Sequence, residues 1–415
     1  MMRLILLCGL AMPCMASVGA NPPMRYSRHI NSKMETFANR CPQKLEEFVG
    51  ALYNKVESTS REDRQQITER SRVSGDGLPF ASLSARDQES LNMACLMIVG
   101  ASSGDQHCLR MLRSPSAADM RPKDRSESMQ FQREATHFYR QNAETNLDCA
   151  YYSACRLLFG IGVQQNVSLA ADYLWMAVRG GHSAGQYLLC AAAALKPEYL
   201  QRSTDFSVFI LECVKQSADQ GYPPAQAVYG VSLMKEGRFS EAVEYYRRSA
   251  EQGDESGQHF YGASLYKGLV RRDLAAAVLY LKLSADQGDA SSQCDYGLFL
   301  MQGECVPKNP ALAVSYFKLS ADQGCAVAQF NYGRALAYGE GIPANLAAAA
   351  SFFRLSADQG YAPAQHCYGA ALMCGEGVER DLVRAGHYLR LAVSQGLTGA
   401  LADLLSLQTM MRTSS

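Results

Sequence analysis

The hexapeptide LSADQG occurs three times without change, at residues 283–288, 319–324 and 355–360. Close variants of it end at Gly221, Gly253 and Gly396. From Gly221 to Gly396, successive closing glycines are 32, 35, 36, 36 and 36 residues apart. A period of this length is typical of solenoids built from pairs of helices, so the sequence predicts an all-α repeat fold.

Equivalent residues fall into columns when each closing glycine is taken as the origin. Glutamine, tyrosine, glycine and leucine follow it by 5, 8, 9 and 12 residues in five consecutive repeats. The columns are Gln226, Gln258, Gln293, Gln329 and Gln365; Tyr229, Tyr261, Tyr296, Tyr332 and Tyr368; Gly230, Gly262, Gly297, Gly333 and Gly369; and Leu233, Leu265, Leu300, Leu336 and Leu372. Such spacing traces one stripe of an α-helix, which we name helix A. Its central glycine costs about 1 kcal/mol relative to alanine, which predicts close approach of a neighbouring helix.

A second helix, helix B, is predicted before each closing glycine. Alanine stands 11 residues before that glycine, and an aromatic residue follows the alanine by three positions. These columns are Ala242, Ala277, Ala313, Ala349 and Ala385, with Tyr245, Tyr280, Tyr316, Phe352 and Tyr388. LSADQG is then the last turn of helix B, closed by a left-handed glycine. We expect its leucine and its Ser-Ala pair to pack against neighbouring helices, so the motif is structural rather than catalytic.

The turn between helices A and B carries GIGV at 160–163, GECVP at 303–307, GEGIP at 339–343 and GEGV at 375–378. With the alanine and aromatic columns, this turn resembles the Sel1-like repeat family, which is related to tetratricopeptide proteins. The resemblance covers five clear repeats from about 221 to 396 and an earlier unit at 148–181. Residues 182–220 depart from it, because AAAALKPEYLQRS replaces the glycine turn. The resemblance implies a right-handed α/α solenoid of helix-turn-helix repeats over 148–396, capped by a helix in 397–415.

The first 147 residues lie outside the clear repeat pattern. Residues 1–20 combine Arg3, an apolar stretch and the small residues Val18 to Ala20, which predicts a signal peptide. The alternative is an apolar first helix. Residues 21–147 show helical spacing at KLEEFVGALYNKVES and ESLNMACLMIVGAS, and form either a separate helical cap or a degenerate extension of the solenoid. Residues 113–135, rich in Ser, Asp and Arg, are predicted to be a linker.

Partner contacts are expected where the repeats differ. Helix A positions 3, 6, 7, 10, 13 and 14 after the closing glycine lie opposite the repeated stripe. In Sel1-like and tetratricopeptide folds helix A lines the concave groove, so the resemblance implies that this face binds other proteins or peptides. We predict that the binding groove includes His259, Asp295, Phe330, Asn331, Arg334 and His366. The alternative is that several of these side chains pack between adjacent repeats.

Catalytic and metal sites have weaker support in the sequence. Ser315 and Lys318 have the S-x-x-K spacing of serine acylases, but the S-D-N and K-T-G motifs that accompany it are absent. His366, Cys367, Cys374 and His387 are potential metal ligands, yet the two cysteines lie about 10 Å apart along a helix, which is long for one zinc ion. We expect no enzyme activity, metal or cofactor, and keep a hydrolase at Ser315 as the alternative.

Charge and hydropathy bear on which classes of partner to expect. Lys plus Arg equals Asp plus Glu, at 40 each, which gives no reason to expect nucleic acid. No run of eighteen apolar residues is present, so no membrane span is expected. We predict an exported scaffold or adaptor protein; the resemblance implies roles in protein quality control, envelope signalling or host interaction. The alternative is a cytoplasmic regulatory protein with reduced cysteines.

Overall fold

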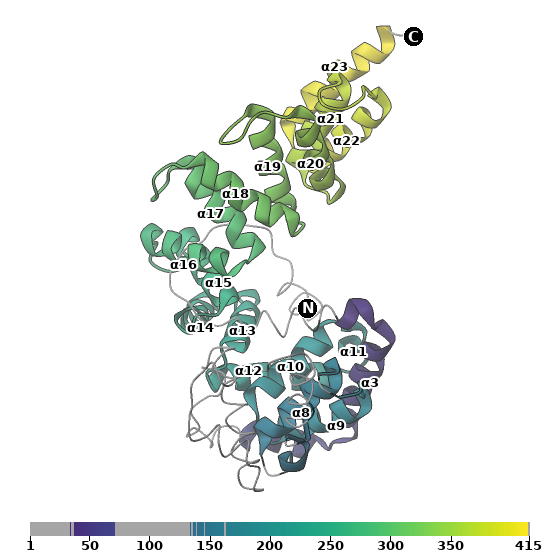
Figure 1. Cartoon of the computed structure of the whole chain (residues 1–415), viewed down its shortest axis with the longest axis vertical. Helices are drawn as coiled ribbons and strands as arrows, with labels where there is room; N and C mark the ends of the chain where they lie inside the picture. Colours follow the sequence, from purple (N-terminus) through teal and green to yellow (C-terminus); the bar gives the residue numbers. More distant parts are fainter. Residues whose placement is uncertain are drawn as a thin grey trace. The chain divides into compact units, whose positions relative to one another are not determined.

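The computed structural model describes residues 34, 37–70, 133, 136–137, 139–144, 146–161 and 163–413. All regular structure within these ranges is α-helical (Figure 1). None of the helices described there is long and apolar enough to cross a membrane. The predicted signal peptide at 1–20, the segment ESLNMACLMIVGAS and, apart from residue 133, the predicted linker at 113–135 lie outside the described residues.

The chain divides into two compact units, with the boundary between Gly257 and Gln258, inside α15 (Glu255–Lys267). Described helices of the first unit are α3 (Pro42–Ser58), α4 (Arg61–Arg70), α8 (Leu147–Phe159), α9 (Val167–Arg179), α10 (Ser183–Ala194), α11 (Pro197–Arg202), α12 (Thr204–Asp219), α13 (Pro223–Lys235) and α14 (Phe239–Glu251). Those of the second unit are α16 (Leu274–Gln287), α17 (Ala290–Gln302), α18 (Pro310–Asp322), α19 (Ala326–Tyr338), α20 (Leu346–Asp358), α21 (Ala362–Cys374), α22 (Leu382–Ser394) and α23 (Thr398–Thr413).

Helices A and B alternate through the second unit. Each of α17, α19 and α21 is a helix A that packs against the helix B before it and, more extensively, against the helix B after it. Ring contacts join the predicted columns of one repeat, as between Tyr296 and Tyr316, whose ring centroids lie 5.1 Å apart. The predicted all-α solenoid of helix pairs is therefore confirmed.

Glycine is needed in two kinds of position, and for different reasons. The closing glycines have positive φ angles, for example 92° at Gly324 and 89° at Gly360, while a Cβ atom there would meet no other atom within 4 Å. Backbone conformation rather than space thus requires glycine, as predicted. In the middle of helix A, by contrast, a Cβ atom on Gly333 would lie 2.9 Å from the ring of Phe353 in helix B. The predicted close approach is confirmed.

The serine and the glutamine of LSADQG bond to neighbouring helices. The serine donates to a carbonyl at the start of helix A, as Ser356 Oγ does to the Ala326 oxygen at 2.6 Å. The closing glutamine donates to the glutamine of helix A: Gln359 Nε2 lies 2.8 Å from Gln329 Oε1. Gln329 Nε2 in turn lies 3.3 Å from the Ala321 carbonyl oxygen of the preceding helix B. A buried glutamine thus links three successive helices, which explains why this column is polar.

The leucine of LSADQG differs from the expectation. Leu319 is 52% exposed and Leu355 44% exposed, whereas the following Ser-Ala pairs are buried. The expectation that this leucine packs against neighbouring helices was wrong for these two copies, while Leu283 of the first copy is half-buried. The buried side of the last helical turn is already filled by the serine and alanine, so the leucine preceding them points away from the core.

Among the described helices of the first unit, α3, α4 and α11 have no counterpart in the repeat pattern. Helix α11 forms the section that replaces the glycine turn, and α3 packs against α9, α10, α11 and α12. Buried apolar residues of α3, among them Phe48 and Leu52, face this contact. Polar bonds surround it: Tyr199 Oη donates to Glu46 Oε1 at 2.6 Å, and Lys55 Nζ lies 2.5 Å from Asp172 Oδ1. The segment KLEEFVGALYNKVES is thus helical, as predicted.

Candidate partner-binding surface

Three of the six predicted groove residues are buried. His259 in α15, Asp295 in α17 and Asn331 in α19 lie among the helices. Asn331 Nδ2 donates to the Val327 carbonyl oxygen at 3.0 Å, one turn back in its own helix. Burial lowers the pKa of His259, although Asp289 opposes the shift, so its imidazole is neutral at pH 7. These three side chains expose little area, and their role in binding stays a prediction.

Phe330 and Arg334 lie one turn apart on α19. The Phe330 ring is partly buried and lies 5.9 Å from the ring of Phe353 and 5.4 Å from that of Tyr361. Arg334 is exposed, and its Cζ atom lies 5.9 Å from the centroid of the Phe330 ring. This cation–π contact orients a guanidinium that remains open to solvent.

His366 bonds to the last helix of the chain. Its Nε2 atom lies 2.7 Å from Asp403 Oδ2, which joins α21 to α23. The imidazole is half-buried in this contact. His366 therefore holds α23 in place, whether or not it also touches a partner.

The same face of helix A holds three apolar residues that the sequence prediction did not name. Tyr338, at the end of α19, is 73% exposed. Leu298 and Met301 of α17 are half-buried and pack on the core with part of their surface. All three occupy positions 10, 13 or 14 after a closing glycine, which are on the predicted face. Their spacing from the closing glycine predicts the side of helix A on which they lie, but their exposure depends on the neighbouring repeat.

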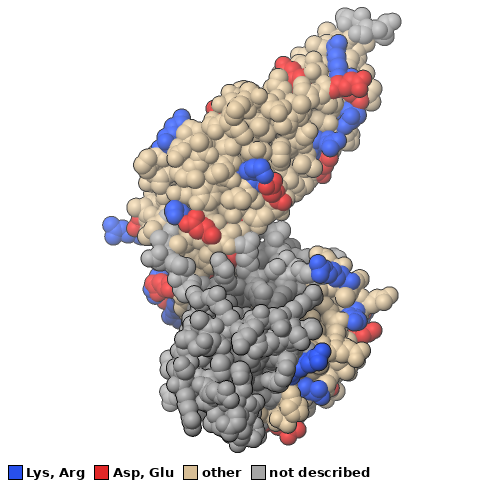
Figure 2. All heavy atoms as spheres, viewed as in Figure 1, with Lys and Arg blue, Asp and Glu red and all other residues tan. Residues whose placement is uncertain are grey.

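Exposed charge on these helices is positive. Among the described helices A from Gln258 to Cys374, the exposed charged side chains are Lys267 and Arg334, since Asp295 is buried. Acidic residues stand in the turns that follow, at Glu304, Glu340 and Glu376. On the face of the molecule that Figure 2 shows, charged side chains of both signs form small separate groups on a mostly uncharged surface.

Six segments match the family model described as Sel1 repeat: residues 147–182, 227–254, 256–289, 290–325, 326–361 and 362–397. The chain belongs to the Sel1 repeat family. The matches omit residues 183–226, where α11 interrupts the pattern. A comparison with curated proteins found no match.

Solved Sel1-type structures resemble the chain at low sequence identity. A protective antigen from uropathogenic Escherichia coli strains, described as displaying an SLR fold, superposes with a TM-score of 0.56 at 23% identity, over 92% of this chain and 84% of that one. A Sel1 repeat protein from Oxalobacter formigenes aligns at 19% identity over 97% of this chain and 99% of its own, with a TM-score of 0.45. The first likeness supports the fold alone.

The S-x-x-K pair of this Sel1 repeat protein is not arranged as a nucleophile and its base. Ser315 Oγ donates to the Leu312 carbonyl oxygen at 2.7 Å, within its own helix. Lys318 Nζ bonds to Asp322 Oδ2 at 2.7 Å, and this bond raises the pKa of Lys318. A lysine that activates serine needs a lowered pKa, which is the opposite direction.

The Sel1 repeats place the potential metal ligands in separate surroundings. In the described part of the chain, no three His, Cys, Asp or Glu side chains group closely enough to hold a metal ion. His366 bonds to Asp403 instead, and burial raises the pKa of the Cys367 thiol, which disfavours the thiolate that a metal would bind.

Proposed function

We propose that this Sel1 repeat protein is a scaffold that binds a peptide segment of a partner protein on the helix A face of its second unit. Sel1 repeat proteins are generally protein-interaction scaffolds. The observation that carries the proposal is the difference between the two sides of helix A. The repeated residues are buried and bonded between helices, whereas the exposed residues of the opposite face differ from repeat to repeat.

The side chains on this face suggest the chemistry of the partner. Tyr338, Leu298 and Met301 offer apolar surface, and aromatic and arginine residues are enriched where interfaces derive their affinity. Arg334 adds an exposed guanidinium that can bind a carboxylate through two parallel hydrogen bonds. The proposed ligand is therefore a peptide with apolar side chains and at least one carboxylate, either acidic or C-terminal.

A peptide selection tests this proposal on the whole protein. Random peptides displayed on phage would be selected on the folded chain, and the affinity of the selected peptides measured by fluorescence anisotropy. We expect acidic, apolar sequences whose affinity falls about tenfold or more, or 1.4 kcal/mol, in Arg334→Glu and Tyr338→Ala. Lys318→Glu on α18 is the matched control, because that exposed cation lies on helix B.

Two results would contradict the proposal. The selection could enrich no binding sequence from a diverse library. Alternatively, selected peptides could bind Arg334→Glu and Tyr338→Ala as tightly as they bind the unmodified protein. The second result would place the binding surface away from helix A of the second unit, since both variants change exposed side chains and should leave the fold intact.

A further inference from the structure

One column of the repeat is kept without being fully buried. A leucine stands 5 residues before the closing glycine in four successive helices B of the second unit, at Leu283, Leu319, Leu355 and Leu391. The last three are 52%, 44% and 36% exposed, and the first is half-buried. In the first unit the same column holds Met176, Gln216 and Arg248. The leucines are thus confined to α16, α18, α20 and α22, and packing within the repeat does not account for the exposed ones.

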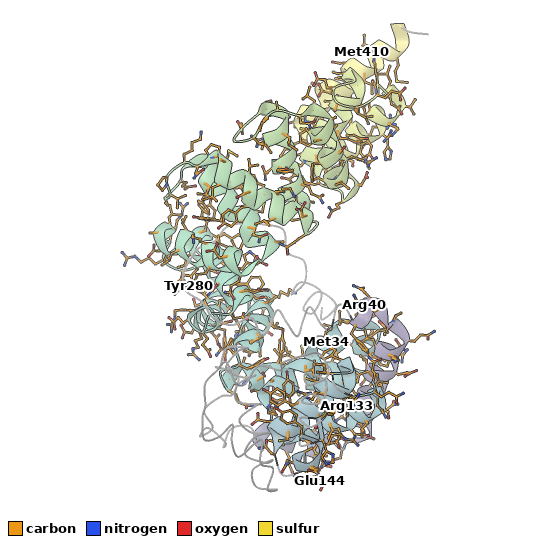
Figure 3. All side chains as sticks on the ribbon, in the orientation of Figure 1. Met34, Arg40, Arg133, Glu144, Tyr280 and Met410 are labelled. Carbon is orange, nitrogen blue, oxygen red and sulfur yellow. The ribbon has the colours of Figure 1, made fainter. Side chains whose placement is uncertain are left out.

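These four leucines, which we name the leucine stripe, run across the outer side of the second unit, away from the buried Ser-Ala pairs. Successive helices B are neighbours, because Tyr316 of α18 bonds to Asp286 of α16 and Tyr388 of α22 bonds to Asp358 of α20. Packed helices lie about 8–10 Å apart, so the leucines recur at about that interval. Figure 3 shows the side chains along this unit, from Tyr280 on α16 to Met410 on α23.

A cation directly precedes each leucine of the stripe. These cations are Lys282, Lys318, Arg354 and Arg390. Each of the two lysines is bonded to an aspartate one turn later in its own helix, at 2.7 Å. Arg354 and Arg390 are exposed and form no ion pair among the residues that the structure describes. On α20 and α22 the stripe therefore combines exposed leucines with guanidinium groups that are available to a carboxylate.

The first unit shows what covers this side of helix B. Helix α3 packs against α9 and α12, which are the helices B of that unit's first two repeats (Figure 1). Lys55 of α3 bonds to Asp172, which stands 9 residues before the closing Gly181 of α9, in the column of the exposed Leu279 of α16. Leu45 and Leu52 of α3, seven residues apart, are buried. An amphipathic helix is therefore the element that the outer side of helix B accepts in this chain.

A helix also matches the spacing of the leucine stripe. Seven residues advance an α-helix by about 10.5 Å and return it to within about 20° of the same direction. A helix lying across α16, α18, α20 and α22 would thus place one apolar residue of each heptad near one leucine. Carboxylates beside its apolar residues would reach Arg354 and Arg390. Both the spacing and the charge of the stripe therefore specify an acidic amphipathic helix.

We propose that the leucine stripe binds an amphipathic helix of a partner protein, with apolar residues at heptad spacing and carboxylates beside those that lie on α20 and α22. This mode of recognition seats a helix on an exposed apolar surface through regularly spaced anchors. The stripe lies on helices B, whereas the peptide surface proposed above lies on helices A. The two surfaces are separate, so this inference does not rest on the first one, and one chain has room for two partners.

A library of helical peptides tests this surface on the whole protein. Phage would display peptides of about 24 residues, or about 36 Å of helix, with leucine fixed at every seventh position and the other positions randomised. After selection on the folded chain, we expect Asp and Glu to be enriched beside the fixed leucines. Affinity measured by fluorescence anisotropy should fall about tenfold or more in Leu355→Glu and in Arg354→Glu. Leu401→Glu on α23 is the matched control, because Leu401 is 46% exposed but lies outside the stripe.

Further variants separate this surface from the one on helix A. Arg334→Glu and Tyr338→Ala should leave the affinity of the selected helices unchanged, and circular dichroism should show the same helical signal in every variant. A library that yields no binder, or binders that Leu355→Glu does not affect, would overturn the proposal. A dimer in sedimentation velocity that Leu355→Glu dissociates would also overturn it, because a second copy of the chain would then cover the stripe.

Discussion

The two units use the same repeat, but they stabilise it differently. In the second unit, the buried helix A glutamines Gln293, Gln329 and Gln365 each bond to the end of their own helix B and to the helix B before it. In the first unit Gln226 makes the same two bonds. Gln186, by contrast, bonds both to Gln220 and to Gln216, which stands where the second unit has an exposed leucine such as Leu319. The first unit also adds α3 and α11, which lie outside the repeat.

This difference between the units shows where a repeat needs contacts with a helix from outside the repeat array. A regular repeat buries its apolar stripe against the next repeat alone. Where the glycine turn is replaced by α11, Tyr199 of that helix instead packs against Tyr53 of α3, with ring centroids 5.4 Å apart, and bonds to Glu46. The irregular repeat is thus stabilised by a helix from outside the array, whereas the regular repeats need none.

The largest expected effect is a loss of stability in the first unit that leaves the second unit folded. Phe48→Ala removes a fully buried ring of α3 and should destabilise the first unit by about 3–5 kcal/mol. Trp175 in α9, the only tryptophan of the chain, reports on this unit by fluorescence, while circular dichroism reports on both. Denaturant titration should show an earlier fluorescence transition with part of the helical signal retained.

Phe353→Ala in α20 is the matched change in the second unit. It should shift the circular dichroism and leave the fluorescence transition of Trp175 in place, because the Phe353 ring packs within the repeats of the second unit. If both variants shift both signals together, the two units unfold as one, and the contrast between them has no energetic meaning.

A smaller effect tests what the units share. Gly333→Ala puts a Cβ atom 2.9 Å from the Phe353 ring, and Gly230→Ala puts one 2.5 Å from the Tyr246 ring in the first unit. Overpacking of this kind costs about 1–3 kcal/mol, whereas helix propensity alone would favour alanine by about 1 kcal/mol. Equilibrium unfolding therefore separates the two effects, because overpacking lowers the free energy of unfolding and helix propensity raises it. Stabilisation by either alanine would show that the helices do not approach closely at that column.

The smallest effect concerns a variation within the second unit. Tyr316 Oη donates to Asp286 Oδ1 at 2.7 Å and Tyr388 Oη to Asp358 Oδ1 at 2.6 Å, but Phe352 stands in the same column and lacks the hydroxyl. Phe352→Tyr should add about 0.5–1 kcal/mol to the free energy of unfolding, and Tyr316→Phe should remove a similar amount. Thermal melts of both variants measure this, and equal stabilities would mean that the bond contributes nothing.

The same tyrosines predict a pH dependence. Burial, and then the bond to Asp358, raise the pKa of Tyr388 from 10.0 to about 12. Because the neutral phenol is the form that the fold favours, its contribution is complete below pH 10 and is lost as the pH rises through 12. Melting temperatures measured on alkaline titration should fall less in Tyr388→Phe than in the unmodified chain over this window.

The sequence was sufficient for the repeat because identical residues recur at fixed spacing. The period, the two helices, the left-handed closing glycine and the close contact at Gly333 all followed from it. Burial could not be predicted with the same success. Leu319 was expected to pack but is exposed, and Asp295 was placed in a groove but is buried, because each depends on side chains of an adjacent repeat.

The sequence by itself determined the local structure of every regular repeat, since each column specifies a backbone conformation or a helix face. Tertiary structure decided which positions on those faces reach solvent. Tyr338 is exposed, Asn331 two turns earlier is buried, and Leu401 and Leu405 of α23 are exposed, although all lie on similar helices. The physical reason is that a helix fixes directions around its own axis, whereas exposure depends on what stands in those directions, and that is supplied by other parts of the chain.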